Sequence, residues 1–314
     1  MTRPSGSDPD GLVVVDKPAG WTSHDVVARM RRVMGTRRVG HAGTLDPMAT
    51  GVLVLGVGRC TKLLTYVVGA DKTYLATIRL GISTVTDDAE GDALESPGVG
   101  VIPADALDEA IARLTGDIQQ VPSSVSAIKV NGVRSYARVR GGEDVQLPSR
   151  PVTVSEFVVF ESRSGQSEDG VAVLDVDVRV TCSSGTYIRA LARDLGDDLG
   201  VGGHLTALRR TRVGGFDLRS AVPAELLIDR DTVHPTPDLL SAAEAASRVL
   251  PVREVSQEEA TNLSHGRWLT PSGDAEPVAA LSNEGELLAV LRDEDRRGET
   301  LARPILVFST PGRD

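Results

Sequence analysis

The segment from Gly40 to Gly51 reads GHAGTLDPMATG, and it joins a basic stretch to an apolar run. Pro47 biases the preceding residue, Asp46, toward an extended backbone, and Gly43 permits the close approach of a ligand. An extended aspartate on a stiff loop can direct its carboxylate into a cleft. The alternative is an ordinary turn, in which Asp46 caps the residues that follow it. Local physics alone leaves both interpretations open.

The elements on both sides of this segment are predicted from hydrophobic periodicity. Continuous or alternating apolar runs predict strands at residues 11–16, 52–57, 72–80, 152–160, 171–182, 278–281, 287–291 and 305–308. Apolar residues at helical spacing predict helices around residues 26–34, 104–115, 188–199 and 237–249. Residues 39–50 and 82–103 have no clear period and are expected to form loops.

These elements predict a fold class and a division of the chain. Strands and helices are interspersed without regular alternation, which favours an α+β fold with a mixed sheet. The 314 residues are enough for two domains. We expect a disordered leader at 1–10, a main domain at 11–250 and a small β-rich domain at 251–314. Inside the main domain, residues 121–150 carry scattered Pro, Gly and Arg and are interpreted as a mobile basic excursion.

Composition disfavours several classes of protein. The chain has two cysteines and no Cys-x-x-Cys pair, so we expect small core residues rather than disulfides or a zinc site. Its N-terminus does not resemble a signal peptide, and no apolar run approaches the ~20 residues of a membrane helix, so a cytoplasmic protein is expected. Motifs for ATP, dinucleotides, serine hydrolases or metals are missing from the sequence, so no cofactor is expected.

The net charge of −10 argues against nucleic acid when it is taken alone. Its distribution matters more than its sum. Basic residues gather in three clusters, namely Arg29, Arg31, Arg32, Arg37 and Arg38, then Lys129, Arg134, Arg138, Arg140 and Arg150, and finally Arg209, Arg210 and Arg212. Each cluster alone is typical of a solvated helix face. Three clusters together favour an acidic protein with a basic face.

Four further side chains could carry chemistry or bind a base. His41 suits a general base because the pKa of histidine lies near neutrality, or it makes a structural hydrogen bond. Tyr74 could stack on a base, or it fills the core beneath its strand. Tyr187 and Arg189 open the helix predicted near 188–199. An arginine there could pair with a distant carboxylate or bind phosphate, or it lies on the surface.

Five segments in chain order resemble the TruB family of bacterial tRNA pseudouridine-55 synthases. The segments are Asp16–Ser23 (DKPAGWTS), Gly40–Gly51 (GHAGTLDPMATG), Lys72–Tyr74 (KTY), Ser183–Ala192 (SSGTYIRALA) and Gly203–Arg210 (GHLTALRR). Each motif alone has moderate specificity, and five in order are very specific. The resemblance covers residues 11 to 215. It implies a pseudouridine-synthase mixed sheet, and more weakly a PUA-like C-terminal domain.

The resemblance also implies roles for the residues at the matching positions. Asp46 is the catalytic residue, and Arg189 pairs with it. Tyr74 stacks on the target uracil, while Tyr187 and Leu208 shape the pocket. The adjacent cation would keep the carboxylate ionised. Whether Asp46 attacks the sugar, attacks the base or removes a sugar proton stays open at this point.

Other positions are assigned to RNA contacts in the same way. His41 is expected near the flipped-out nucleotides. Further expected RNA contacts are Lys17, Arg37, Arg38, Lys129, Arg209 and Arg210. Residues 121–150 correspond to an RNA-clasping insertion. One departure is Val125, which replaces a tyrosine of many members and puts the contact made by that tyrosine in doubt.

The expected activity is therefore isomerisation of uridine 55 in the TΨC arm of tRNA to pseudouridine, by a monomer without guide RNA or protein partner. Two alternatives stay open. One is an RNA-binding or tRNA-folding module with secondary or lost catalysis, which an intact Asp46, Tyr74 and Arg189 disfavour. The other is a synthase with different RNA targets, such as the guide-dependent relatives. Because those relatives lack the basic insertion at 121–150, its presence favours the stand-alone tRNA enzyme.

Overall fold

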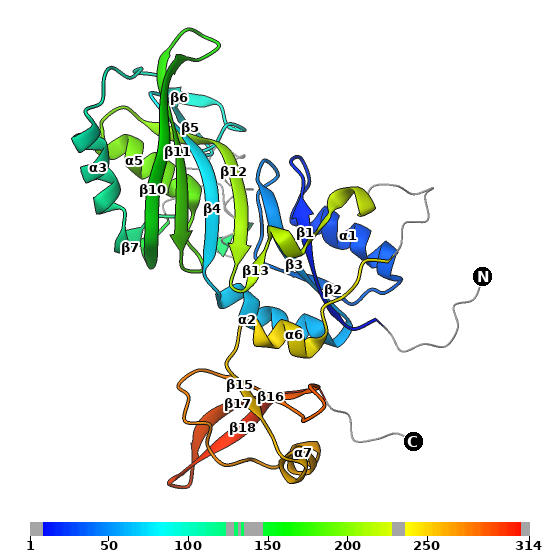
Figure 1. The fold of residues 1–314 in the computed structure, drawn as a ribbon. Coiled ribbons are helices and arrows are strands. Elements are labelled where there is room, and N and C mark those ends of the chain that lie inside the picture. Colours follow the sequence, from blue (N-terminus) through cyan, green and yellow to red (C-terminus); the bar gives the residue numbers. More distant parts are fainter. Residues whose placement is uncertain (1–8, 124–128, 131–132, 135–146, 228–235, 309–314) are drawn as a thin grey trace. The chain divides into compact units, whose positions relative to one another are not determined.

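The computed structural model describes residues 9–123, 129–130, 133–134, 147–227 and 236–308 (Figure 1). The predicted leader, apart from its last two residues, and most of the predicted basic excursion, with Val125, lie outside these residues. The chain consists of two compact units. The first unit is Met1–Pro47, Gly51–Ala70 and Val213–Asp314, and the second is Met48–Thr50 and Asp71–Arg212.

The described helices and strands agree with an α+β fold. The helices are α1 (Ser23–Met34), α2 (Leu64–Gly69), α3 (Ala104–Arg113), α5 (Ile188–Asp198), α6 (Ala242–Ser247) and α7 (Gln257–Ser264). The strands before the basic excursion are β1 (Gly11–Lys17), β2 (Val39–Ala42), β3 (Thr50–Val57), β4 (Lys72–Leu80), β5 (Ser83–Thr84), β6 (Ala93–Glu95) and β7 (Gly116–Gln120). The later strands are β8 (Lys129–Val130), β9 (Val133–Arg134), β10 (Arg150–Gln166), β11 (Ala172–Cys182), β12 (Gly203–Val213), β13 (Phe216–Asp217), β14 (Ala221–Pro223), β15 (Val252–Glu254), β16 (Val278–Leu281), β17 (Leu287–Arg296) and β18 (Glu299–Val307).

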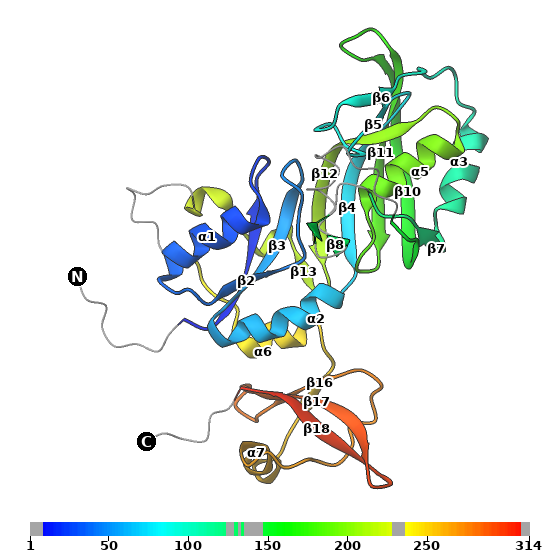
Figure 2. The ribbon, with the colours of Figure 1, turned by 180° about the vertical axis from the view of Figure 1, so that it is seen from behind.

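In the first unit, strands run in the order β14-β1-β3. β2 also pairs with β3, and Figure 2 shows both strands beside helix α1. The pairing of β1 with β14 is parallel and its pairing with β3 is antiparallel, so the predicted mixed sheet is confirmed. Helix α1 covers these strands with Val26, Met30 and Met34. Its ends are defined by a capping box between Thr22 and Asp25 and by Gly35 in the left-handed conformation.

The C-terminal part of the first unit has a small sheet of its own. Its order is β15-β16-β17-β18, with β15 parallel to β16 and the other two pairings antiparallel. Helix α7 packs with this sheet through Leu263, beside Ala280, Leu288 and Leu291. The expectation of a small β-rich C-terminal domain is thereby confirmed.

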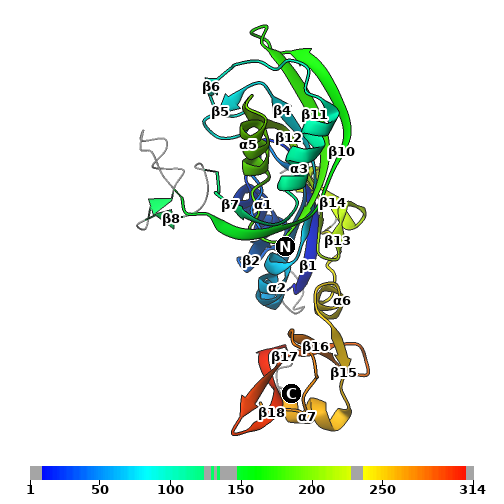
Figure 3. The same cartoon turned by 90° about the vertical axis from the view of Figure 1, so that its left-hand side faces the viewer.

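In the second unit, strands run in the order β12-β4-β11-β10-β7. The pairings of β4 with β11, β11 with β10 and β10 with β7 are antiparallel. Helices α3 and α5 lie beside each other over one face of these strands (Figure 3). Alternation along β4 buries Tyr74, Ala76, Ile78 and Leu80, because side chains at every second position share a face.

The structure corrects three predictions about individual segments. Residues 82–103, expected to be a loop, contain the short paired strands β5 and β6. Residues 39–50, expected to be a loop, contain β2, whose Val39 and Ala42 are buried in pairing with β3. The helix expected at 237–249 is only α6, because Leu240 instead exchanges two backbone hydrogen bonds with Leu12. No described helix has the length and hydrophobicity that crossing a membrane requires.

Candidate active site

The residue before Asp46 is anchored to the start of helix α1. The backbone N–H of Leu45 donates to Ser23 Oγ at 2.9 Å, and this hydroxyl donates to the carbonyl of Leu45 at 3.3 Å. Both residues are buried, with 1% of Ser23 and 4% of Leu45 exposed. One serine therefore satisfies both backbone groups of Leu45, and it fixes the chain on the N-terminal side of Asp46.

The residue after Asp46 is anchored as well. The carbonyl of Pro47 accepts from the backbone N–H of Gly20 at 2.8 Å and from Lys17 Nζ at 3.2 Å. Lys17 Nζ also donates to the carbonyls of Pro18 and Trp21. Asp46 itself is half-buried. The backbone on both sides of Asp46 is thus held by hydrogen bonds, which is the arrangement that a pre-organised catalytic group needs.

Lys17 is not placed for the RNA contact that we expected of it. Its side chain is fully buried, and three backbone carbonyls surround its ammonium group at 2.6 to 3.2 Å. An ammonium group enclosed in this way cannot reach a phosphate. The structure instead gives Lys17 a role in holding the loop of Asp46.

Other expected RNA contacts of the first unit lie closer to solvent. Arg37 and Arg38 are exposed. His41 is half-buried in β2, and its ring meets that of His24 edge to face at a centroid distance of 5.5 Å. The exposure of Arg37, Arg38 and His41 is compatible with RNA contacts. The RNA contacts of these three residues stay predictions.

The buried faces of β4 and β12 carry two expected pocket residues. Tyr74 is 7% exposed on β4, and Leu208 is 8% exposed on β12. Arg209 is half-buried and donates to Thr50 Oγ1 at 3.2 Å, at the end of the predicted catalytic motif. Arg210, by contrast, is 1% exposed, so the phosphate contact expected of it does not fit its position. For Lys129 in β8, the side chain lies outside the described part of the structure.

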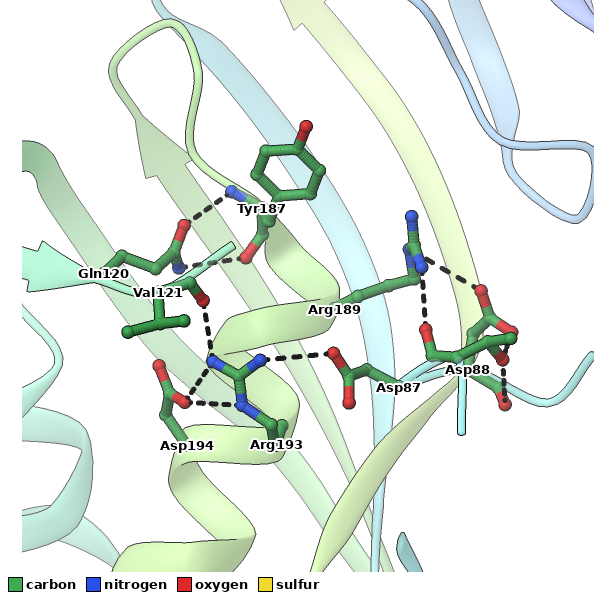
Figure 4. A network of polar contacts seen from close by, with 9 residues as sticks. Asp87, Asp88, Gln120, Val121, Tyr187, Arg189, Arg193 and Asp194 are labelled. Carbon is green, nitrogen blue, oxygen red and sulfur yellow. Dashed lines mark hydrogen bonds and ion pairs between the residues drawn. The ribbon is translucent and has the colours of Figure 1, made fainter. Parts of the chain in front are cut away.

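Arg189 is held by a carboxylate and a carbonyl of the second unit (Figure 4). Its Nε lies 3.5 Å from Asp88 Oδ2, and its guanidinium donates to the carbonyl of Thr86 at 2.7 Å. Both charged side chains are nearly inaccessible to solvent, with 5% of Arg189 and 4% of Asp88 exposed. Sequence reasoning missed Asp88, because it lies in an acidic segment that was expected to be a loop. The pairing expected between Arg189 and Asp46 stays a prediction.

Tyr187 occupies the N-cap position of α5 and lacks a side-chain cap bond of its own. The side chain of Gln120 provides its backbone partners, as Figure 4 shows. Six residues further along the chain, Arg193 joins Asp87, Asp194 and the carbonyl of Val121. The segment from Tyr187 to Arg193 is therefore anchored to neighbouring elements at several points.

Burial also tunes two kinds of ionisable group. It raises the pKa of the thiols of Cys60 and Cys182 to about 11 in each case. Both cysteines are buried and neither is in a disulfide, as expected for small core residues. Burial, with Arg210 nearby, lowers the pKa of Lys72 to about 8.

Most of the chain matches models of one protein family. Residues 31–188 match the profile of the TruB family pseudouridylate synthase (N-terminal domain). Residues 189–246 match the tRNA pseudouridylate synthase B C-terminal domain, and residues 250–308 match the C-terminal domain of tRNA pseudouridine synthase II.

Individual relatives give the same result. The tRNA pseudouridine synthase B of Arthrobacter sp. (strain FB24) is 57% identical over 308 residues, covering 95% of this chain and 96% of that protein. Its counterpart in Thermobifida fusca (strain YX) is 56% identical, covering 96% of this chain and 99% of that protein. A chain of the crystal structure of a Cbf5-Nop10-Gar1 complex has the same fold, with a TM-score of 0.70, 24% identity and coverage of 96% of this chain and 85% of that one. The chain belongs to the TruB family of pseudouridylate synthases.

Proposed function

We propose that this protein converts uridine 55 in the TΨC arm of tRNA to pseudouridine, with Asp46 as its catalytic residue. The observation that carries the proposal is the loop of Asp46, which Ser23 holds at Leu45 while Lys17 and Gly20 hold it at Pro47. The relatives named tRNA pseudouridine synthase B support tRNA as the substrate.

The chemistry explains why such a loop is needed. Isomerisation breaks the bond between N1 of uracil and C1′ of ribose and forms a bond between C1′ and C5. C5 loses its proton and N1 gains one, so the composition of the nucleoside is unchanged. No electron is transferred to or from the substrate. The target base must first leave its stack, because enzymes that act on a base extrude it into a pocket. A carboxylate fixed in advance then meets the flipped nucleoside without rearrangement.

The pocket residues keep their proposed roles. Tyr74 stacks on the target uracil, while Tyr187 and Leu208 shape its surroundings. Tyr74 and Leu208 offer buried apolar surface, which suits a base removed from water. The exposed Arg37 and Arg38, with His41, bind RNA around the flipped nucleotide. Residues 251–314 form a separate PUA-like domain, and the enzyme acts without guide RNA or a protein partner.

Mapping of pseudouridine in an unmodified tRNA transcript tests this proposal. The purified protein alone should produce one carbodiimide-dependent stop in primer extension, at position 55. A transcript with cytidine at position 55 should give no stop and should bind with similar affinity.

Other results would support the alternatives. Modification at a different position would contradict the assigned specificity. Binding of the transcript without any modification would favour the tRNA-binding module. Modification only after addition of a guide RNA would favour the guide-dependent class.

A further inference from the structure

Two side chains from adjacent strands converge on the segment that begins helix α5. Gln120 ends β7 and Arg150 begins β10, and the two residues are directly paired across these antiparallel strands. Gln120 reaches the backbone of Tyr187, and Arg150 reaches both its ring and the carbonyl of Gly185. All of these residues belong to the second unit.

Gln120 binds Tyr187 at both of its backbone groups. The N–H of Tyr187 donates to Gln120 Oε1 at 2.9 Å, and Gln120 Nε2 donates to the carbonyl of Tyr187 at 3.0 Å. Gln120 is fully buried, so water does not compete for these bonds. The amide therefore acts on Tyr187 as a neighbouring antiparallel strand would, by exchanging two hydrogen bonds with one residue.

Arg150 acts on the ring of the same tyrosine. The centre of its guanidinium lies 4.8 Å from the centroid of the Tyr187 ring, within the range of a cation–π interaction. The same guanidinium donates to the carbonyl of Gly185, a glycine with a φ of 92°. Arg150 thus links the turn before α5 to the ring plane of Tyr187.

We propose that Gln120 and Arg150 are positioning residues, which fix the backbone and the ring of Tyr187 for the target uracil. This inference rests on the proposed function, in which Tyr187 lines the pocket. Because Arg189 follows two residues later in the first turn of α5, a displaced Tyr187 backbone also displaces Arg189. Gln120 therefore affects two site residues, whereas the ring contact of Arg150 affects one.

Single-turnover kinetics with saturating enzyme separate positioning from binding and from folding. Gln120→Met conserves side-chain size and removes both hydrogen bonds. We expect its rate constant to fall about tenfold, as the loss of one or two buried hydrogen bonds implies, with tRNA affinity within about twofold of the wild type. A merely structural defect would lower the amplitude of product formation and leave the rate constant of the folded fraction unchanged. The matched control is Gln119→Met, because Gln119 is the exposed neighbour on β7.

Arg150 allows a double-mutant cycle with its target. Arg150→Met should lower the rate constant about threefold, the size of an exposed cation–π contact. In a Tyr187→Ala background the same substitution should have no effect on the rate constant, because the ring is gone. A phosphate contact by Arg150 would instead weaken tRNA binding equally in both backgrounds. Arg163→Met, at an exposed arginine of the same strand, is the control.

Fluorine NMR tests the placement of the Tyr187 ring without a measurement of enzyme activity. The chain has four tyrosines, so 3-fluorotyrosine gives few resonances, and Tyr187→Phe assigns the one of interest. Gln120→Met and Arg150→Met should shift this resonance, and Gln119→Met should not.

An unchanged resonance, or a Gln120→Met rate constant equal to that of Gln119→Met, overturns the positioning role. If the wild type modifies no tRNA while the resonance shifts as expected, the proposed function fails and the placement of Tyr187 by these two residues stands.

Discussion

Substitution of Ser23 by alanine should uncouple the loop of Asp46 from helix α1. The change removes one hydroxyl from a buried site and leaves the N–H and carbonyl of Leu45 without this partner. An unsatisfied buried backbone group costs about 1–3 kcal/mol, and the bond to the carbonyl, at 3.3 Å, is the weaker of the two. We therefore take about 2 kcal/mol for the whole substitution.

This energy can appear in two measurable quantities. If the contact holds Asp46 in its reactive position, about 2 kcal/mol corresponds to a fall of roughly 30-fold in the single-turnover rate constant. If the contact only stabilises the fold, the free energy of unfolding falls by the same amount and the rate constant does not change.

We expect a fall of 10- to 30-fold in the rate constant, with tRNA affinity within twofold of the wild type. Release of tritium from tRNA labelled at C5 of uridine measures the rate, and Ser162→Ala on the exposed part of β10 is the control. A rate constant equal to that of the control would show that Ser23 does not hold the reactive loop.

Four other predictions follow from burial and charge. Lys17→Met should lower the free energy of unfolding by about 2–4 kcal/mol, since it removes the ammonium donor from three carbonyls, of which that of Pro47 keeps the N–H of Gly20. It should not change the salt dependence of tRNA binding. Arg37→Glu with Arg38→Glu should weaken binding at low salt and reduce the salt slope by about two; an unchanged slope would remove both arginines from the RNA face. Both cysteines should resist iodoacetamide at pH 8 in the folded protein, because a thiol pKa of about 11 leaves little thiolate, and labelling at the rate of a free thiol would contradict their burial. Burial lowers the pKa of Lys72 from the ordinary 10.5 of lysine to about 8 in the folded protein. The unfolded chain therefore binds more protons between these pH values, and stability should rise with pH there. Lys72→Met should lack about 2 kcal/mol of that rise between pH 8 and 10, and equal pH profiles of the two proteins would refute it.

Periodicity located most of the long elements, although not the 11-residue strand β12, because burial on one face repeats at a fixed spacing. The strand predicted at residues 72–80 has the same bounds as β4, and the one at 278–281 has the same bounds as β16. It failed at β2, because the sequence VGHA contains a glycine and a histidine and forms no apolar run. This strand exists through its pairing with β3.

The basic clusters were partly misinterpreted for a related reason. Arg209 and Arg210 were treated as one charged surface, but they are adjacent residues of β12. Adjacent side chains of a strand point to opposite faces, so Arg210 shares the buried face of Leu208 while Arg209 is half-buried. Lys17 was misinterpreted for a different reason, because it ends β1, a strand that is largely buried on both faces.

The site residues that sequence reasoning missed all act through contacts with distant segments. Asp88 and Gln120 contact α5 and its N-cap, and Ser23 contacts Leu45. Ser23 ends the Asp16–Ser23 motif, but that motif does not indicate its contact with Leu45. Asp88 and Gln120 lie in an acidic segment and at a strand end, which are common in any α+β protein. Their roles become apparent only after folding brings their partners together.

The central claim is that Asp46 carries the chemistry, and Asp46→Asn tests it most directly. The substitution keeps the size of the side chain and removes its charge. Wild-type protein should release the tritium of one uridine per tRNA, and the variant should release none while it binds the same tRNA with affinity within about twofold. Release of label by the Asp46→Asn protein at a rate near that of the wild type would contradict the account.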